Sequence, residues 1–233
     1  MMKRLTRLMP AALACAALLL APALAAGAEK VLKPFNGKNL DGWKTKGQKH
    51  FWTVGTAALD PANPKELAVK TEGHELVNAK AHGSDIYSEA THGDAVIRLE
   101  VMVPQGSNSG IYVHGEYEIQ VLDSWGHEKP GGGDMGAVYG AAPPKEPVYK
   151  KPGEWSTYEI HFRAPRFDAA GKKTANARLE KVVLNGKVIH ADLELKGPTP
   201  GGVNGKEKAE GPIMFQGNHG PVAYRNIVIT PMK

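Results

Sequence analysis

Apolar and polar residues alternate along much of this chain, most clearly in the segment 109–123, SGIYVHGEYEIQVLD. Successive side chains of a β-strand point to opposite faces, so this pattern predicts a hairpin with one apolar and one polar face, provided that parity is kept across Gly115. The apolar parity carries Ile111, Val113, Tyr117, Ile119 and Val121. The polar parity carries Tyr112, His114, Glu116, Glu118 and Gln120. The polar row is either a solvated sheet surface or the floor of a binding site.

Short segments of the same kind recur along the chain, separated by Gly, Pro, Asn or Asp. They are rich in β-branched and aromatic residues, and no stretch has convincing helical periodicity. Examples are FWTV, ELAVK, AVIRLEVMVP, STYEIHFRA, KVVLNGKVIHADLEL, GPIMFQG and VAYRNIVI. The pair Asn185-Gly186 between two apolar runs predicts a type I′ hairpin. The sequence therefore predicts an all-β protein, an antiparallel sandwich or barrel, with polar loops at 125–136, 166–181 and 197–211.

Residues 1–25 have the layout of a secretory signal peptide. Basic residues precede an apolar run that ends at Leu24, and small residues surround the expected cleavage site near Ala25. Cleavage leaves a single domain over residues 26–233, in the periplasm or secreted. Cys15 is the only cysteine and lies in the peptide, so the mature chain must fold without a disulfide.

Removal of this peptide changes the charge of the chain. The whole sequence has 29 Lys and Arg against 24 Asp and Glu, a formal charge of +5. Three of the basic residues lie in the peptide, so the mature chain carries +2. This near-neutral balance argues against nucleic acid as a partner. No second membrane-spanning segment is apparent, and we expect no membrane partner after cleavage.

Polar rows also occur in two other segments. In AVIRLEVMV, Arg98 and Glu100 share one parity, and in STYEIHFR so do Glu159, His161 and Arg163. A curved sheet lined with such side chains can form a polar groove suited to a sugar. Antiparallel sheets often have one solvated face, and we favour that interpretation for the row in STYEIHFR.

The spacing of Glu118, Gln120 and Asp123, E-x-Q-x-x-D, resembles the E-x-D-x-x-E strand of laminarinase- and lichenase-type glucanases. In those retaining enzymes the outer carboxylates are nucleophile and general acid, about 5–5.5 Å apart. Gln120 cannot hold a proton between its neighbours as an Asp can, and Asp123 is one methylene shorter than Glu. The architecture is suggested, while the two departures weaken the case for a retaining mechanism.

A closer resemblance covers nearly the whole mature chain in order. Its motifs are FNGKNLDGW at 35–43, NSGIYVHGEYEIQVLD at 108–123, GAVYGAAPP at 136–144, PGEWSTYEI at 152–160, VLNGKVI at 183–189 and GPIMFQGNHGPVAYRNIVI at 211–229. They are similar to the DUF1080 family, named as 3-keto-disaccharide hydrolases. The resemblance implies a concanavalin A-like jelly-roll β-sandwich of two antiparallel sheets, commonly exported by bacteria that degrade glycosides.

The chain departs from the pattern of that family at four places. His114 stands where the family often has Arg, and QGNH at 216–219 stands where Gln-Asp-His-Gly is common. The loops at 163–181 and 197–211 are longer than usual. All four places border the expected groove, so they bear on the substrate more than on the fold.

A 3-keto sugar can lose its aglycone by elimination. The ketone acidifies the C2 proton, the C1 substituent leaves from the enolate, and water can add for net hydrolysis. This chemistry needs a base near C2, donors or an electrophile at the C3 oxygen, and an acid at the leaving oxygen. Glu118 is the first candidate for base or acid, with His219 as its partner because imidazole titrates near neutral pH. Asp123 and His114 complete the candidate catalytic set.

Six further residues are candidates for binding the substrate. Four offer hydrogen bonds or aromatic faces to a sugar: Gln120, Gln216, Tyr139 and Trp125. Arg98 either stabilises the enolate oxygen or pairs with Glu100, and we favour the pairing.

A divalent metal ion is an alternative electrophile for the enolate. The sequence has no H-x-H or H-x-x-x-H pair, so the candidate ligands are one dispersed set: His114, Glu118, Asp123 and His219. No other cofactor is indicated.

Three functions remain open at this point. The first is an exported enzyme that cleaves 3-keto-glycosides, including 3-keto-disaccharides, by elimination, hydrolysis or both. The second is a conventional retaining glycosidase, and the third is a non-catalytic carbohydrate-binding sandwich. In all three the partner is a small-molecule or oligosaccharide glycoside.

Overall fold

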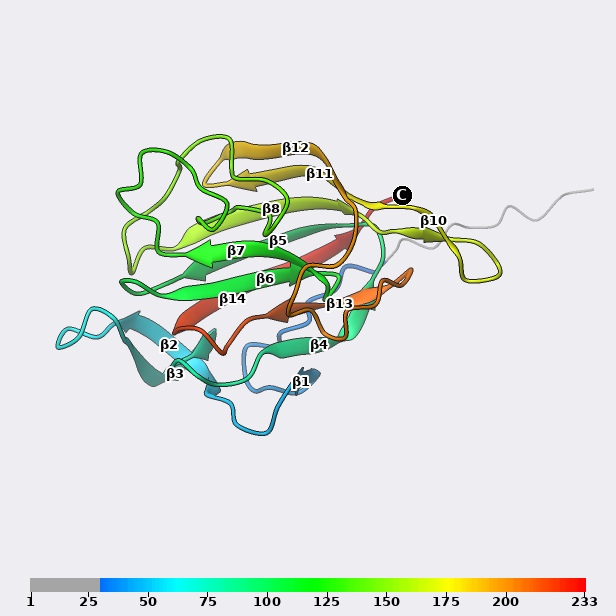
Figure 1. Ribbon diagram of the computed structural model, residues 1–233. Coiled ribbons are helices and arrows are strands. Elements are labelled where there is room, and N and C mark those ends of the chain that lie inside the picture. The colour runs from blue at the N-terminus through cyan, green and yellow to red at the C-terminus, as the bar shows by residue number, and fades with distance from the viewer. Residues whose placement is uncertain (1–29) are drawn as a thin grey trace, which may run out of the picture.

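The computed structural model describes residues 30–233, and within this range the chain forms strands and loops without a helix. Two large antiparallel sheets pack face to face (Figure 1), so the prediction of an all-β jelly-roll sandwich is confirmed. The expected signal peptide, residues 1–25, lies outside the described residues. No helix in the described range is long and apolar enough to cross a membrane.

The sheet nearer the viewer in Figure 1 has five strands in the order β1-β4-β13-β6-β7. Their bounds are Trp43–Thr45 for β1, Ile86–His92 for β4, Gly211–Phe215 for β13, Asn108–Val113 for β6 and Tyr117–Leu122 for β7. Because β7 is the last strand, one of its edges has no strand beside it. Loops take the place of that missing neighbour.

The second large sheet has seven strands in the order β12-β11-β8-β5-β14-β3-β2. Their bounds are Lys187–Leu195 for β12, Ala177–Leu184 for β11, Ser156–Arg163 for β8, Ala95–Met102 for β5, Val222–Pro231 for β14, Leu67–Asn78 for β3 and Trp52–Leu59 for β2. The expected loop at 166–181 is only partly a loop. Strands β9 (Arg166–Phe167) and β10 (Lys173–Ala175) pair as a small projecting hairpin, and β11 begins at Ala177.

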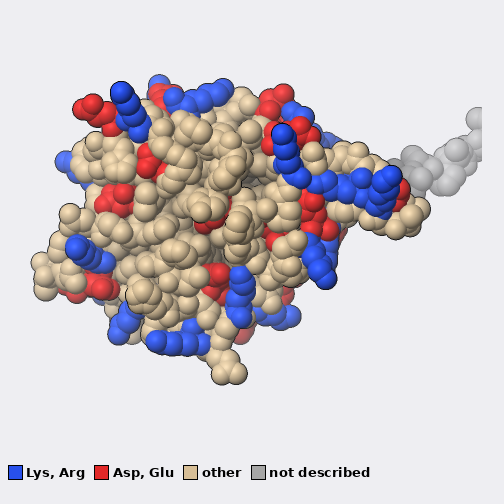
Figure 2. Space-filling model, viewed as in Figure 1, with Lys and Arg blue, Asp and Glu red and all other residues tan. Residues whose placement is uncertain are grey.

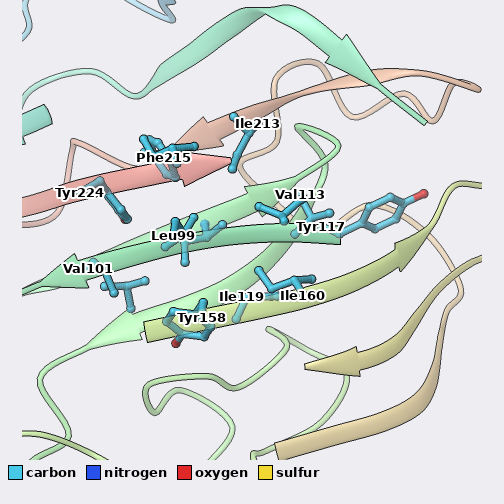
Figure 3. Close-up of a cluster of buried hydrophobic side chains, with 14 of the residues drawn as sticks. Leu99, Val101, Val113, Tyr117, Ile119, Tyr158, Ile160, Ile213, Phe215 and Tyr224 are labelled. Atoms are coloured by element: carbon cyan, nitrogen blue, oxygen red, sulfur yellow. The ribbon is translucent and has the colours of Figure 1, made fainter. Parts of the chain in front are cut away.

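The core lies between the two large sheets (Figure 3). From the five-stranded sheet come Val113, Tyr117, Ile119, Ile213 and Phe215, and from the seven-stranded sheet come Leu99, Val101, Tyr158, Ile160 and Tyr224. All of these side chains are at most 2% exposed. Burial of each such side chain stabilises the fold by about 1.5–3 kcal/mol relative to exposure. The apolar parity predicted for the segment 109–123 is therefore the inward face of the β6–β7 hairpin.

Two tight turns need left-handed backbone. In the β11–β12 turn, Asn185 and Gly186 have φ values of 51° and 81°, and Leu184 pairs with Lys187, which confirms the predicted type I′ hairpin. In the β6–β7 turn, His114 and Gly115 have φ values of 58° and 74°. Strand pairing resumes with Tyr117 opposite Val113, so the parity of the hairpin is kept across this turn.

His114 does not follow the polar parity, because its left-handed conformation turns the side chain towards the core. Its ring centroid lies 5.3 Å from that of Phe162 and 5.6 Å from that of His92. Burial, followed by the neighbouring His92, lowers the pKa of His114 to about 4. The polar row of the sequence therefore contains one buried, neutral imidazole that belongs to the core.

Candidate active site

Four polar side chains form the centre of the outer face of the five-stranded sheet. Glu118 and Gln120 lie on β7, Tyr112 lies opposite Glu118 on β6, and Gly110 lies opposite Gln120. Gln216 follows β13, and its N–H donates to the carbonyl of Gly110 at 3.0 Å. Each of the four side chains is less than a tenth exposed. They form a sunken polar floor rather than a fully solvated sheet face.

Gly110 makes room for the carboxyl group of Glu118. A Cβ atom at position 110 would collide with Oε1 of Glu118 and would lie 3.1 Å from its Cγ and Cδ atoms. The carboxyl group therefore lies directly over the backbone of β6. A glycine is needed here because of this close approach, not because of its φ angle.

The environment of Glu118 holds its carboxyl group near the midpoint of titration at neutral pH. Burial raises the pKa of Glu118 to about 7, the Tyr112 hydroxyl opposes this rise, and the charge of Asp85 adds to it. Burial also raises the pKa of Tyr112, and the Glu118 carboxylate raises it further. Glu118 is therefore able to accept or donate a proton near pH 7, which is what a general base or acid requires.

One wall of the site is the segment 199–205, which is attached to the floor. The Tyr112 hydroxyl donates to the carbonyl of Pro200 at 3.0 Å. The ammonium group of Lys46 donates to the carbonyls of Gly201 and Gly202 at 2.7 and 2.9 Å. These bonds tie the wall to β6 and to the end of β1.

Two carboxylates complete this attachment. Asp85 lies 3.5 Å from the ammonium nitrogen of Lys46. The carboxylate of Glu116 accepts the N–H groups of Asn204 and Gly205 at 3.0 and 2.9 Å. Glu116 shares the polar parity of Glu118, but it is occupied in holding the segment 199–205 in place.

The loop after β7 folds back along the free edge of that strand. The N–H of Tyr139 donates to the carbonyl of Glu118 at 3.1 Å, and Gln120 exchanges backbone hydrogen bonds of 2.8 Å with Gly136 and Ala137. Tyr139 is 44% exposed and Trp125 is 52% exposed. The ammonium group of Lys151 lies over the Trp125 ring, 5.5 Å from its centroid, and only Tyr139 is joined to the strand that carries Glu118.

Asp123 is not placed beside Glu118 as the glucanase pattern requires. It lies beyond the end of β7, and its carboxylate accepts the N–H groups of Gly106 and Trp125 at 2.8 and 3.2 Å. The pairing of β7 with β6 is continuous from Tyr117 to Leu122, so no irregularity turns Asp123 to the side of Glu118. Asp123 therefore caps a strand end and shapes the following turn.

His219 is also separated from the floor. It is exposed in the turn between β13 and β14, and its ring bonds to the side chain of the adjacent Asn218. Gly220, the next residue, lies against Ser107 and Asn108, where β6 begins. Among the described residues, no hydrogen bond or ion pair joins His219 to Glu118.

Arg98 and Glu100 lie on the opposite side of the molecule, on the outer face of the seven-stranded sheet. Arg98 pairs with Glu159 on β8 at 3.0 Å, not with Glu100 as expected. Glu100 pairs with Arg225 on β14 at 2.7 Å. The cause is that residues directly opposite on neighbouring strands meet more readily than residues two apart on one strand. Neither side chain can touch a sugar bound at Glu118.

A family model described as the 3-keto-alpha-glucoside-1,2-lyase-like domain matches residues 31–230. The chain belongs to this family. The resemblance to the DUF1080 proteins is thereby confirmed, and the chain is a member of a carbohydrate-active family. No match is found among curated proteins.

Solved structures support the same assignment. A protein from Parabacteroides distasonis, named as a candidate glycosyl hydrolase, is 27% identical over 88% of this chain and 84% of its own, with a TM-score of 0.67. Two further structures with the same name and source are 17% and 23% identical, with TM-scores of 0.60 and 0.54. They cover 88% and 87% of this chain, and 95% and 100% of their own. These two show that the fold is shared.

The four candidate metal ligands of the sequence, His114, Glu118, Asp123 and His219, do not come together in the structure. His114 is in the core, Asp123 caps a strand, and His219 is in an exposed turn. Within residues 30–233, no three His, Cys, Asp or Glu side chains are grouped so that they could hold a metal ion. These four residues therefore do not fit a divalent cation.

Sequence reasoning did not assign a role to three residues that the structure places around Glu118: Tyr112, Lys46 and Asp85. Tyr112 could have been found from the sequence, since it shares the parity of Glu118 and lies on the same hairpin. No pattern in the sequence indicates Lys46 or Asp85. They adjoin the end of β1 and the start of β4, and these two strands pair although they are about 40 residues apart in the chain.

The substitution Gly110→Ala tests the position of the Glu118 carboxyl group without removing it. The new methyl group would push the carboxyl group aside, and because misplacement by about 1 Å can cost about 10²-fold in rate, we expect a large loss of turnover. Stability should change little, because the displaced atoms are the end of a flexible side chain. Steady-state kinetics and thermal unfolding of the same preparation check this, and full activity would show that the carboxyl position is unimportant.

Proposed function

We propose that this protein is an exported enzyme that cleaves 3-keto-glycosides, including 3-keto-disaccharides, by deprotonation at C2 and elimination of the group on C1. The observation that carries this proposal is the buried carboxyl group of Glu118, whose pKa of about 7 suits a base at neutral pH. Membership of the 3-keto-alpha-glucoside-1,2-lyase-like family supports the same substrate class.

In this mechanism Glu118 takes the proton from C2, and the electrons of the C–H bond move into the enolate of the C3 ketone. The enolate then expels the C1 oxygen, which takes up a proton as it leaves, and a C1=C2 double bond remains. Addition of water across that bond gives net hydrolysis. Since no second carboxylate has to act as a nucleophile, the position of Asp123 is compatible with this chemistry.

The neighbours of Glu118 can recognise a sugar. The side-chain oxygen of Gln216 is buried without a hydrogen-bond partner among the described residues, and a turn of this side chain would let it accept a sugar hydroxyl. Gln120 and Gln216 each carry amide N–H donors that can stabilise the enolate oxygen. The exposed ring of Tyr139 lies at the edge of the same strand.

The two other functions have less support. A retaining glycosidase needs a second carboxylate about 5–5.5 Å from the first, and Asp123 is bound to loop N–H groups instead. A carbohydrate-binding sandwich would use the polar floor, but it has no need of a carboxyl group whose pKa is raised to about 7.

Export rests on the sequence of residues 1–25 alone. We expect the mature protein to begin near residue 26 and to occur in the periplasmic or secreted fraction. N-terminal sequencing of the protein recovered from that fraction measures both points. A protein that keeps Met1 and stays in the cytosolic fraction would overturn this part of the proposal.

Product analysis by mass spectrometry separates the three functions. The substrates are 3-keto-trehalose, 3-keto-lactose and 3-keto-cellobiose, each beside its unoxidised parent. Cleavage of the keto sugars alone supports elimination. Cleavage of the parents at similar rates would favour the retaining glycosidase, and binding without cleavage would favour the binding module.

The pH dependence follows from the raised pKa of Glu118. A base must be deprotonated to act, so kcat/KM should be low at pH 5, rise tenfold per pH unit below the pKa, and level off above about pH 7. A buffer series at constant ionic strength measures this profile. A profile that is flat from pH 5 to pH 8 would mean that a different group is the base.

A further inference from the structure

A pocket lies along the free edge of β7, beside the floor that carries Glu118. Its volume is about 480 Å³, within the range of small-ligand sites. Its walls are formed by residues 138–141 from the loop after β7 and by residues 193–200, which include the end of β12. In the view of Figure 2, the surface is hollowed near its middle, with acidic atoms beside the hollow.

Both walls are bonded to the backbone of Glu118 itself. The N–H of Tyr139 donates to the carbonyl of Glu118 at 3.1 Å, and the N–H of Glu118 donates to the hydroxyl of Thr199 at 2.9 Å. Pro200, at the end of the second wall, accepts the hydroxyl of Tyr112. The pocket therefore lies next to the strand that carries Glu118, and its walls are fixed before any ligand binds.

The lining of the pocket is mainly apolar. Leu193, Pro198 and Pro200 contribute aliphatic surface, and Tyr139 contributes a half-exposed aromatic ring. The apolar face of a sugar ring stacks on surfaces of this kind. A methyl group would leave most of this volume unfilled.

We propose that this pocket binds the leaving group of the substrate and selects a leaving group that is one sugar ring. The inference rests on the proposed function, because a leaving group exists only if the bond to C1 is broken. C1 is bonded to C2, so a substrate with C2 at Glu118 must place its leaving group next to that residue. Both walls of this pocket are bonded to the backbone of Glu118, which places the pocket next to that residue.

Ala141→Trp tests this proposal by filling the pocket. Ala141 is exposed and lines the pocket, so a larger side chain can be accommodated without repacking the core. The measured quantity is the ratio of kcat/KM for a 3-keto-disaccharide to kcat/KM for methyl 3-keto-glucoside. We expect this ratio to fall about tenfold or more, the equivalent of about 1.4 kcal/mol of lost binding to the leaving group.

The matched control is Ala170→Trp, the same substitution in the exposed turn between β9 and β10. It should leave the ratio at the wild-type value. A wild-type ratio in the Ala141→Trp protein as well would overturn the proposal, and so would equal losses for both substrates.

Failure of the proposed function would be seen separately, as no turnover of either keto sugar by the wild-type protein. In that case the pocket is tested by isothermal titration with the unoxidised disaccharide. Weaker binding to Ala141→Trp than to Ala170→Trp would support a ring-binding pocket without the elimination chemistry. Equal binding to the two variants, or no binding to either, would overturn it.

Discussion

Replacement of Glu118 by Gln should lower kcat/KM for a 3-keto-disaccharide by about 10²–10⁴-fold, the usual contribution of a general base. The amide has nearly the same shape as the carboxyl group and fits the same space over Gly110, but it cannot accept the C2 proton. Binding of the sugar should persist, because Gln120 and Gln216 remain. Steady-state kinetics gives the first quantity, and isothermal titration with the substrate gives the second.

Glu89→Gln is the matched control for this substitution. Glu89 lies on β4 of the same sheet, where its exposed carboxylate pairs with Lys44 at 3.0 Å, and its loss should not alter turnover. If Glu118→Gln kept wild-type turnover, Glu118 would not be the base. If both variants lost activity equally, the effect would be one of general surface charge.

The same Gln variant has an expected signature in stability. The pKa of Glu118 is raised on folding, so its contribution to stability is present below its ordinary value of 4.5 and is lost as the pH rises through about 7. At 1.36 kcal/mol per pKa unit, the stability lost between these two pH values approaches about 3 kcal/mol. The free energy of unfolding of Glu118→Gln, taken relative to that of the wild type, should therefore be higher at pH 8 than at pH 4.5. The same measurement shows whether a variant without activity is still folded.

Phe215→Ala should produce a large loss of stability, because it removes a ring from the core of the five-stranded sheet. The Phe215 ring is fully buried between Tyr224 and Trp43, with centroid distances of 3.9 and 5.6 Å. Truncation leaves a cavity between the sheets, which costs about 3–5 kcal/mol. For a domain of this size the melting temperature should fall by roughly 6–20 °C. Urea unfolding measures the free energy of unfolding, and calorimetry measures the temperature.

Phe167→Ala provides the comparison for that result. Phe167 is half-buried on β9, in the projecting hairpin outside the core, so its truncation should cost about 1 kcal/mol or less. Equal losses for Phe215 and Phe167 would mean that the ring stack between the sheets is not an important source of stability.

The fold was predictable from the sequence because its determinants are local. Alternation assigned the inward face of the β6–β7 hairpin correctly, and Asn185-Gly186 indicated the β11–β12 turn. His114 was misplaced for a local reason as well. A residue with φ near +60° does not continue the alternation of its strand, and parity alone could not reveal that conformation.

The candidate site was predictable only along a single hairpin. Parity brings Glu118 and Gln120 together on β7, whereas Gln216 reaches them only through a second pairing, that of β13 with β6. The sheet to which a polar row belongs depends on the topology of the sandwich. The alternation around Arg98 and Glu100 looks much the same as that around Glu118. It could not show that these two residues lie on the seven-stranded sheet, on the opposite side of the molecule from Glu118.

The most direct measurement is the rate of cleavage of a 3-keto-disaccharide that carries deuterium at C2, compared with the same sugar carrying hydrogen. If Glu118 removes the C2 proton, the deuterated substrate should be cleaved more slowly by the wild-type protein, and recovered substrate should exchange C2 hydrogen with D₂O only when Glu118 is present. Equal rates for the two substrates, together with no exchange at C2, would contradict deprotonation by Glu118.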